Sequence, residues 1–256
     1  RSQYSNNPNR SPTAMTECLI ALGGNIGDVR ATFATALELL ATQPGIEITS
    51  ASRCFVTEPV GENAGPAYLN AAATLVTSLK PDQLLETTKR VEHQLGRERD
   101  HATWVPRTVD LDLVTYGDLV AQDDRLKVPH PGCWYRRFVL DPVCRIAGST
   151  RHPARNLTFD QLRERLLVRP LPVWLDSDER DERIEELRGR FPEIVWANDP
   201  AATHDNGIAL PGDPVPPDSL VDVLTAAVGG VELADEIPGW PEPDSVPTAS
   251  PGPDST

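Results

Sequence analysis

The chain has 256 residues, 39% of them hydrophobic, and a net charge of −14. This length and apolar content predict one or two domains with a hydrophobic core. The acidic balance argues against nonspecific nucleic-acid binding by the whole chain, and the absence of an apolar run of about 18 residues argues against a membrane span. The four cysteines form no zinc-binding pattern, so we expect reduced thiols and a cytoplasmic protein.

The negative charge is concentrated in one part of the chain. Residues 176–256 hold 19 acidic side chains and four arginines, whereas residues 1–175 hold 19 acidic and 20 basic side chains. We therefore expect a nearly neutral domain over 15–175 and an acidic, proline-rich extension over 176–256. Met15 is the only methionine and directly precedes the first apolar run, so we expect the natural start there and a disordered leader over 1–14.

The domain alternates short apolar runs with amphipathic segments. Four segments have the apolar content or alternation of strands: 18–22, 46–55, 69–79 and 109–116. Between them lie two segments with helical periodicity, one capped by Asp28 and one opened by Pro81. Two further helices are expected over 136–146 and 157–167.

The resulting order is β-α-β-β-α-β with later additions. It indicates an α+β fold, a ferredoxin-like α/β sandwich with a mainly antiparallel sheet and helices packed on it. With helices covering one face of the sheet, we expect the other face to be open to ligands.

The extension combines two kinds of sequence. Residues 172–197 read as a small β-α-β addition, because a highly charged helix separates two apolar stretches. Beyond Asn198 the chain is rich in Pro, Asp and Gly, and only 220–228 has the apolar content of a short helix. We expect disorder elsewhere in this part, because its composition buries too little apolar surface to fold alone.

Two carboxylates stand two residues apart in the strand predicted at 109–116. Residues at this spacing point to the same face of a strand, so Asp110 and Asp112 project together. Adjacent carboxylates repel each other unless a cation lies between them, and oxygen ligands at this spacing suit Mg²⁺. The alternative is a solvated strand face with two unrelated acids, and the motif alone leaves both open.

Basic side chains accompany this strand in the sequence. Arg97, Arg99 and Arg107 precede it closely, and arginines neutralise the charge that spreads over phosphoryl oxygens during polyphosphate transfer. A solvated charged loop is the alternative. His130 stands between two prolines and is followed by Arg136, which suits an anion site, although a lone histidine more often makes a structural hydrogen bond.

Three other residues suit a flat heterocycle. The amide of Asn70 both donates and accepts hydrogen bonds, and its neighbour Tyr68 can stack on a ring face. Trp104, in the arginine-containing loop, has no evident core role and can close over such a ring. No GxxxxGK[ST] pattern is present, which excludes P-loop chemistry.

Together these segments resemble the hydroxymethyldihydropterin pyrophosphokinase family, in that family's order and spacing. The matching segments are LGGNIGD at 22–28, TEPVG at 57–61, YLNAAATL at 68–75, GRERDHATWVPRTVDLDLVTYG at 96–117 and VPHPGCWYRRFVLDPVCRIAG at 128–148. The resemblance covers about residues 17–175, and the pattern WxPRxxDLDL is highly specific. Thr103 and Pro131 depart from residues found in some members, without touching the carboxylate pair.

The resemblance implies a transferase that moves pyrophosphate from ATP, its co-substrate, to 6-hydroxymethyl-7,8-dihydropterin in folate biosynthesis. It implies that Asp110 and Asp112 hold two Mg²⁺ ions, and that Arg97 and Arg107 act on ATP and the transferred group. The implied ATP contacts are Glu92, His130 and Arg136. The implied pterin contacts are Thr57, Gly61, Tyr68, Asn70, Trp104 and Phe138.

The alternative is a catalytically inactive pterin- or nucleotide-binding module whose acidic tail engages a protein partner. The intact Asp110/Asp112 pair and its arginines argue against it. The expected partners are small molecules, with no nucleic acid and no membrane. Because the resemblance ends before the extension, a truncation after Asn198 is expected to keep kcat and KM within about twofold.

Overall fold

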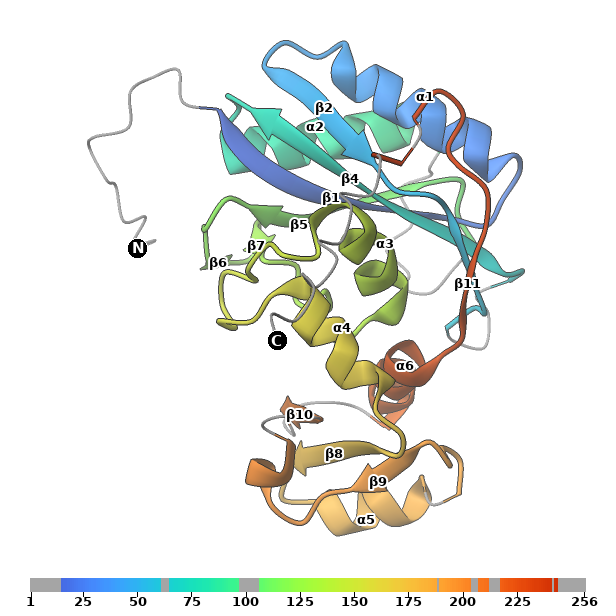
Figure 1. Cartoon of the computed structure of the whole chain (residues 1–256), viewed down its shortest axis with the longest axis vertical. Helices are drawn as coiled ribbons and strands as arrows, with labels where there is room; N and C mark the ends of the chain where they lie inside the picture. Colours follow the sequence, from blue (N-terminus) through green and yellow to red (C-terminus); the bar gives the residue numbers. More distant parts are fainter. Residues whose placement is uncertain are drawn as a thin grey trace, which may run out of the picture.

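The computed structural model describes residues 15–60, 65–96, 106–187, 189–203, 207–211, 217–240 and 242–243 (Figure 1). Among those residues, no helix combines the length and the apolar composition that a membrane crossing requires.

An antiparallel sheet forms the centre of the molecule. In spatial order its strands are β11 (Val231–Leu233), β3 (Phe55–Thr57), β4 (Tyr68–Thr77), β1 (Thr16–Gly24) and β5 (Asp110–Tyr116), and β2 (Ile46–Ala51) also pairs with β4. Strands β1 and β2 both run antiparallel to β4, whereas β4 and β5 both run antiparallel to β1. Two β-α-β units are therefore interleaved, and the predicted α+β class with an antiparallel sheet is confirmed.

Helices α1 (Val29–Ala41) and α2 (Pro81–Gln94) cover one face of this sheet. Asp28 caps α1 by accepting a hydrogen bond from the Ala31 amide, 3.1 Å away, and Pro81 stands in the first turn of α2, where no intrahelical donor is needed. Phe33 and Leu37 of α1 and Leu84 of α2 are fully buried against the sheet. The caps and the apolar spacing thus place both helices where the sequence predicts them.

The second face of the sheet is not left open, contrary to our expectation. Helix α3 (Arg137–Ala147) packs across it, and α4 (Phe159–Leu167) packs on α3. The reason is the apolar side of α3, whose Val139, Leu140 and Val143 are buried together with Leu19 and Ala72 of the sheet. Between β5 and α3 lies a small hairpin of β6 (Ala121–Gln122) and β7 (Lys127–Val128).

Residues that follow α4 form a second, parallel sheet, at the opposite end of the molecule from α1 (Figure 1). Its order is β10 (Ile208–Pro211), β8 (Leu171–Asp176) and β9 (Ile194–Trp196), and α5 (Arg180–Glu186) connects β8 to β9. A short 3-10 helix, η1 (Pro200–Thr203), lies between β9 and β10.

The short helix expected over 220–228 is present, whereas the disorder expected elsewhere beyond Asn198 is wrong for 200–203, 208–211 and 231–233. After β10, helix α6 (Pro217–Val228) packs on α3 and α4, and the chain then returns to the main sheet as β11. The physical reason is the burial of a few apolar side chains, Leu210, Leu220 and Leu224, in the core shared with α3 and α4. The sequence shows the apolar stretch 220–228, but composition averaged over a proline-rich, acidic segment does not reveal the buried Leu210 or the strand that follows α6.

Candidate active site

The ends of three neighbouring strands bring the predicted pterin and metal residues into one row. Gly23 of β1 is paired with Asn70 of β4 on one side and with Asp110 of β5 on the other. A Cβ atom at Gly23 would lie 3.5 Å from Asn70 Oδ1 and 4.0 Å from Asp110 Cβ. The sheet surface between the two side chains is therefore bare at this point, which leaves room for a ligand that reaches both.

The two aspartates share one face, as predicted. Leu111 and Leu113 are buried in the core beneath α1 and α2, whereas Val114 belongs to the core formed with α3. Alternation along β5 thus directs Asp110 and Asp112 to the α3 side of the sheet. Their side chains are 21% and 41% exposed, so both carboxylates are reachable from solvent.

Arg107 and His130 complete a cluster with these carboxylates. The Arg107 guanidinium forms an ion pair with Asp110. His130 Nε2 lies 3.9 Å from Asp112 Oδ2. Four residues that the sequence singles out for phosphate and metal chemistry are therefore neighbours.

His130 is a neutral donor in this cluster. Its Nδ1 accepts a hydrogen bond from the Gly132 amide at 3.2 Å, so Nε2 carries the proton in the neutral ring. Burial, together with the nearby Arg136, lowers the pKa of His130 to about 4, although Asp110 opposes the shift. At neutral pH the ring therefore presents an N–H group toward the carboxylates and carries no charge.

Asn25 holds the backbone around Arg107, a role that the sequence reasoning missed. Its Oδ1 accepts from the Arg107 amide at 2.9 Å, and its own amide donates to the Arg107 carbonyl at 3.0 Å. Its Nδ2 donates to the Pro66 carbonyl at 3.0 Å. A Cβ at the preceding Gly24 would lie 2.6 Å from the Thr108 carbonyl oxygen, so only glycine permits this approach. The signal in the sequence is the segment LGGNIGD at 22–28, which contributes to the family resemblance but assigns no role to Asn25.

Glu92 lies behind the carboxylate strand rather than among the carboxylates. Its side chain is buried at 7% exposure, and Oε1 accepts from the Leu111 amide at 2.6 Å. Helix α2 thereby fixes the segment between Asp110 and Asp112. The expected contact of Glu92 with ATP stays a prediction.

The predicted pterin residues gather on β3, β4 and α3. Thr57 is paired with Tyr68 across these strands, and Asn70 Nδ2 donates to Thr57 Oγ1 at 2.9 Å. Phe138 lies at the start of α3, with the Arg136 guanidinium 5.7 Å from the centre of its ring. Gly61, Arg97 and Trp104 lie outside the described residues, as do Arg99 and Thr103.

A divalent cation fits this donor set. Where the structure describes the chain, no group of three or more His, Cys, Asp and Glu side chains is arranged to hold a metal ion. Asp110 and Asp112 could supply two carboxylates to an ion that takes its other oxygens from water and phosphate. Mg²⁺ binds in this way at sites that also hold a phosphate substrate.

Comparison with known proteins agrees with the geometry. Residues 19–148 match the family model described as 7,8-dihydro-6-hydroxymethylpterin-pyrophosphokinase. A 2-amino-4-hydroxy-6-hydroxymethyldihydropteridine pyrophosphokinase of Bacillus subtilis is 38% identical over 142 residues, which cover 56% of this chain and 84% of that protein. Its counterpart in Synechocystis is 38% identical over 198 residues, which cover 77% of this chain and 97% of that protein.

A third relative is longer. It is a folate synthesis bifunctional protein of Arabidopsis thaliana, 40% identical over 137 residues, and the match covers 54% of this chain and 28% of that protein. The family model spans half of this chain, and the two shorter relatives are matched over most of their length. The chain therefore belongs to the 7,8-dihydro-6-hydroxymethylpterin-pyrophosphokinase family.

Proposed function

We propose that this protein catalyses the Mg²⁺-dependent transfer of pyrophosphate from ATP to 6-hydroxymethyl-7,8-dihydropterin, giving AMP and the pterin pyrophosphate. The observation that carries the proposal is the Asp110/Asp112 pair beside Arg107 and His130, separated from Asn70 by the single strand β1. In balanced form, the hydroxymethyl oxygen attacks the β-phosphorus of ATP and loses its proton. The bond from that phosphorus to the oxygen shared with the α-phosphorus breaks, and AMP leaves with this oxygen.

The carboxylates and the arginine would prepare the phosphates for this displacement. When bound, two Mg²⁺ ions on Asp110 and Asp112 would neutralise phosphate charge and align the attacking and leaving oxygens. Arg107 is held in place by its backbone bonds to Asn25. Its guanidinium pairs with Asp110 in the structure and would exchange that partner for phosphoryl oxygens, whose charge grows in the transition state.

The remaining residues would bind and orient the substrates. The His130 Nε2–H group suits a phosphate oxygen, because it donates without adding a charge that depends on pH near neutrality. Arg136, at the start of α3, would bind ATP. Asn70, fixed by its bond to Thr57, would present its amide to the edge of the pterin, with Tyr68 and Phe138 against the ring faces.

The direct test mixes the full chain with ATP, Mg²⁺ and 6-hydroxymethyl-7,8-dihydropterin and measures AMP. We expect AMP to form only when all three are present. The competing function, an inactive binding module with a protein partner for its acidic extension, predicts calorimetric binding of pterin or nucleotide without AMP. A folded chain that binds both substrates and forms no AMP would therefore overturn the proposal in favour of that module.

A further inference from the structure

The C-terminal segment 229–240, here called the strap, contacts β3 and α3, two of the three elements that carry the proposed pterin residues. It begins where α6 ends, includes β11 and reaches Trp240. In Figure 1 it runs up one side of the main sheet toward α1. No part of the strap lies within the residues matched by the family model.

The strap closes the edge of the sheet at β3. Val231 is paired with Thr57 and Leu233 with Phe55, in antiparallel register. The pairing continues beyond β3, because the Ala234 amide donates to the Cys54 carbonyl at 2.8 Å and the Cys54 amide donates to the Asp235 carbonyl at 3.0 Å. Further along, Ile237 is 1% exposed and packs in the core beneath α1 and α2. The strap is thus fixed by backbone pairing and by a buried side chain.

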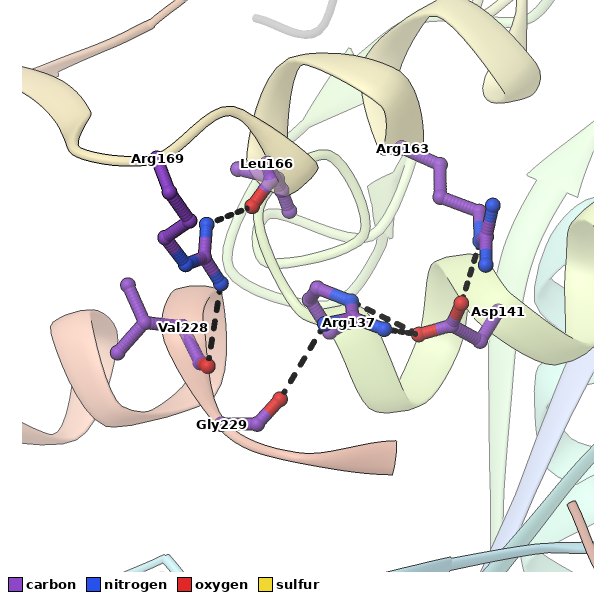
Figure 2. Close-up of polar contacts among 7 residues, drawn as sticks. All are labelled: Arg137, Asp141, Arg163, Leu166, Arg169, Val228 and Gly229. Atoms are coloured by element: carbon purple, nitrogen blue, oxygen red, sulfur yellow. Dashed lines mark hydrogen bonds and ion pairs between the residues drawn. The ribbon is translucent and has the colours of Figure 1, made fainter. Parts of the chain in front are cut away.

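Two arginines bind the junction of α6 and the strap, Arg137 from α3 and Arg169 from the segment after α4 (Figure 2). Arg137 donates to the Gly229 carbonyl at 3.5 Å, and Arg169 donates to the Val228 carbonyl at 3.4 Å. These carbonyls lie at the C-terminal end of α6, where the helix dipole favours positive charge. Because Arg137 is the sequence neighbour of both Arg136 and Phe138, this contact reaches the first turn of α3.

Arg137 is itself fixed by a buried carboxylate. Its Nε donates to Asp141 Oδ2 at 2.9 Å, and Arg163 of α4 pairs with the other oxygen of Asp141, whose side chain is 3% exposed (Figure 2). A buried charge with two partners keeps its geometry, because loss of either partner would leave charge poorly compensated. The contact between the strap and α3 is therefore set by α3 and α4 together.

We propose that the strap is a positioning element for the pterin, which it holds through β3 on one side and α3 on the other. The inference rests on the proposed function. Strand β3 has three residues and only β4 as its other neighbour, and so short a strand with an open edge is prone to local opening. Without the strap, the distance between Thr57 and the start of α3 would no longer be fixed. Asp110 and Asp112 lie on β5 and would keep their positions.

The test compares two truncations of the full chain. One ends after Gly230 and removes β11 with all that follows, and the matched control ends after Pro243 and keeps the strap. For the first we expect the pterin dissociation constant to rise roughly tenfold, about 1.4 kcal/mol. The ATP dissociation constant should rise by at most about twofold, because Arg136 is the one proposed ATP contact at the start of α3, while His130 and the carboxylates lie away from the strap. For the control we expect both constants to stay within about twofold.

A point variant provides a second test in case the shorter chain does not fold. Ala234→Pro removes the amide that donates to Cys54, whereas Ala234→Ser keeps it. We expect the proline variant alone to weaken pterin binding while ATP binding is kept. Equal weakening of both substrates, an unchanged pterin constant in Ala234→Pro, or the same effect in the control truncation would overturn the proposal. Since pterin binding is measured without turnover, a full chain that makes no AMP counts against the proposed function instead.

Discussion

The two edges of the main sheet are stabilised in different ways. At one edge, Glu92 of α2 accepts a hydrogen bond from Leu111 in β5, 19 residues further along the chain. At the other, β3 is covered by β11, which comes from the C-terminal end of the described chain. Uncovered strand edges expose backbone groups that pair readily with other chains. Here each edge also adjoins site residues, so the means of closing it bears on function as well as on stability.

The largest effect is expected at the β5 edge, from loss of either carboxylate. Asp110→Asn and Asp112→Asn should each lower AMP formation by roughly 10³-fold, because under the proposed function each would remove a charged ligand of the Mg²⁺ that stabilises the transferred group. The two variants should differ in stability. Asp112→Asn relieves repulsion and should melt no lower than the wild type, whereas Asp110→Asn also breaks the pair with Arg107.

The Mg²⁺ dependence of ATP binding, followed by calorimetry, checks the assignment of the carboxylates. We expect this dependence to weaken in both variants. An unchanged Mg²⁺ dependence in either would show that the aspartate concerned is not a metal ligand.

Arg107→Ala should have the next largest effect, on kcat more than on KM. The charge that Arg107 meets is greatest in the transition state, so a loss of roughly 10²–10³ in kcat is expected, the scale for one preorganised donor. Single-turnover kinetics separate chemistry from binding. Wild-type chemistry with only a raised KM would contradict this role.

Glu92 offers a direct test of how the β5 edge is closed. Glu92→Leu leaves the Leu111 amide without its buried acceptor and should cost about 1–3 kcal/mol in the free energy of unfolding. Glu92→Gln keeps an acceptor and should cost less. Denaturant unfolding measures both variants. If the glutamine variant stays stable but loses ATP affinity, the charge of Glu92 serves the nucleotide, as the family resemblance implies.

The smallest effect is expected at the strap edge, from its exposed ion pair. Arg30 and Asp235 are joined at 2.7 Å, but their side chains are 42% and 72% exposed. Asp235→Asn should therefore change the free energy of unfolding by at most about 1 kcal/mol. Ile237→Ala, at a position 1% exposed, should cost about 2–5 kcal/mol. Similar losses in the two variants would show that the ion pair, rather than burial, holds the strap.

The β5 side of the site was predictable because its determinants are local in the sequence. Alternation alone places Asp110 and Asp112 on one face, and Asp28 and Pro81 fix the starts of two helices. The nearness of Arg107 to the carboxylates follows from its place just before β5 in the sequence, whereas the arrival of His130 beside them was foreseen only through the family resemblance. Helix or strand periodicity cannot show that Arg107, before β5, lies near His130, which follows the β6-β7 hairpin.

The strap could not be predicted, because its determinants are distant contacts. Val231, Leu233 and Ile237 are isolated apolar residues among Glu, Asp and Pro, and their burial depends on pairing with β3 and packing under α1. The same holds for Asn25, whose three hydrogen bonds reach Pro66 and Arg107. The expectation that a truncation after Asn198 preserves activity is therefore replaced by the expectation of weakened pterin binding.

The pairing of β11 with β3 also has a consequence for synthesis on the ribosome. Strand β3 emerges roughly 175 residues before its partner, which at 5–20 residues per second leaves its edge uncovered for about 10–35 s. Once residue 130 has been added, the nascent chain contains every residue of the carboxylate cluster, but the edge of β3 still has no cover. In newly made chains the proposed nucleotide-binding part of the site would then form before the pterin-binding part. The order in which the site forms would follow the order of its segments in the sequence.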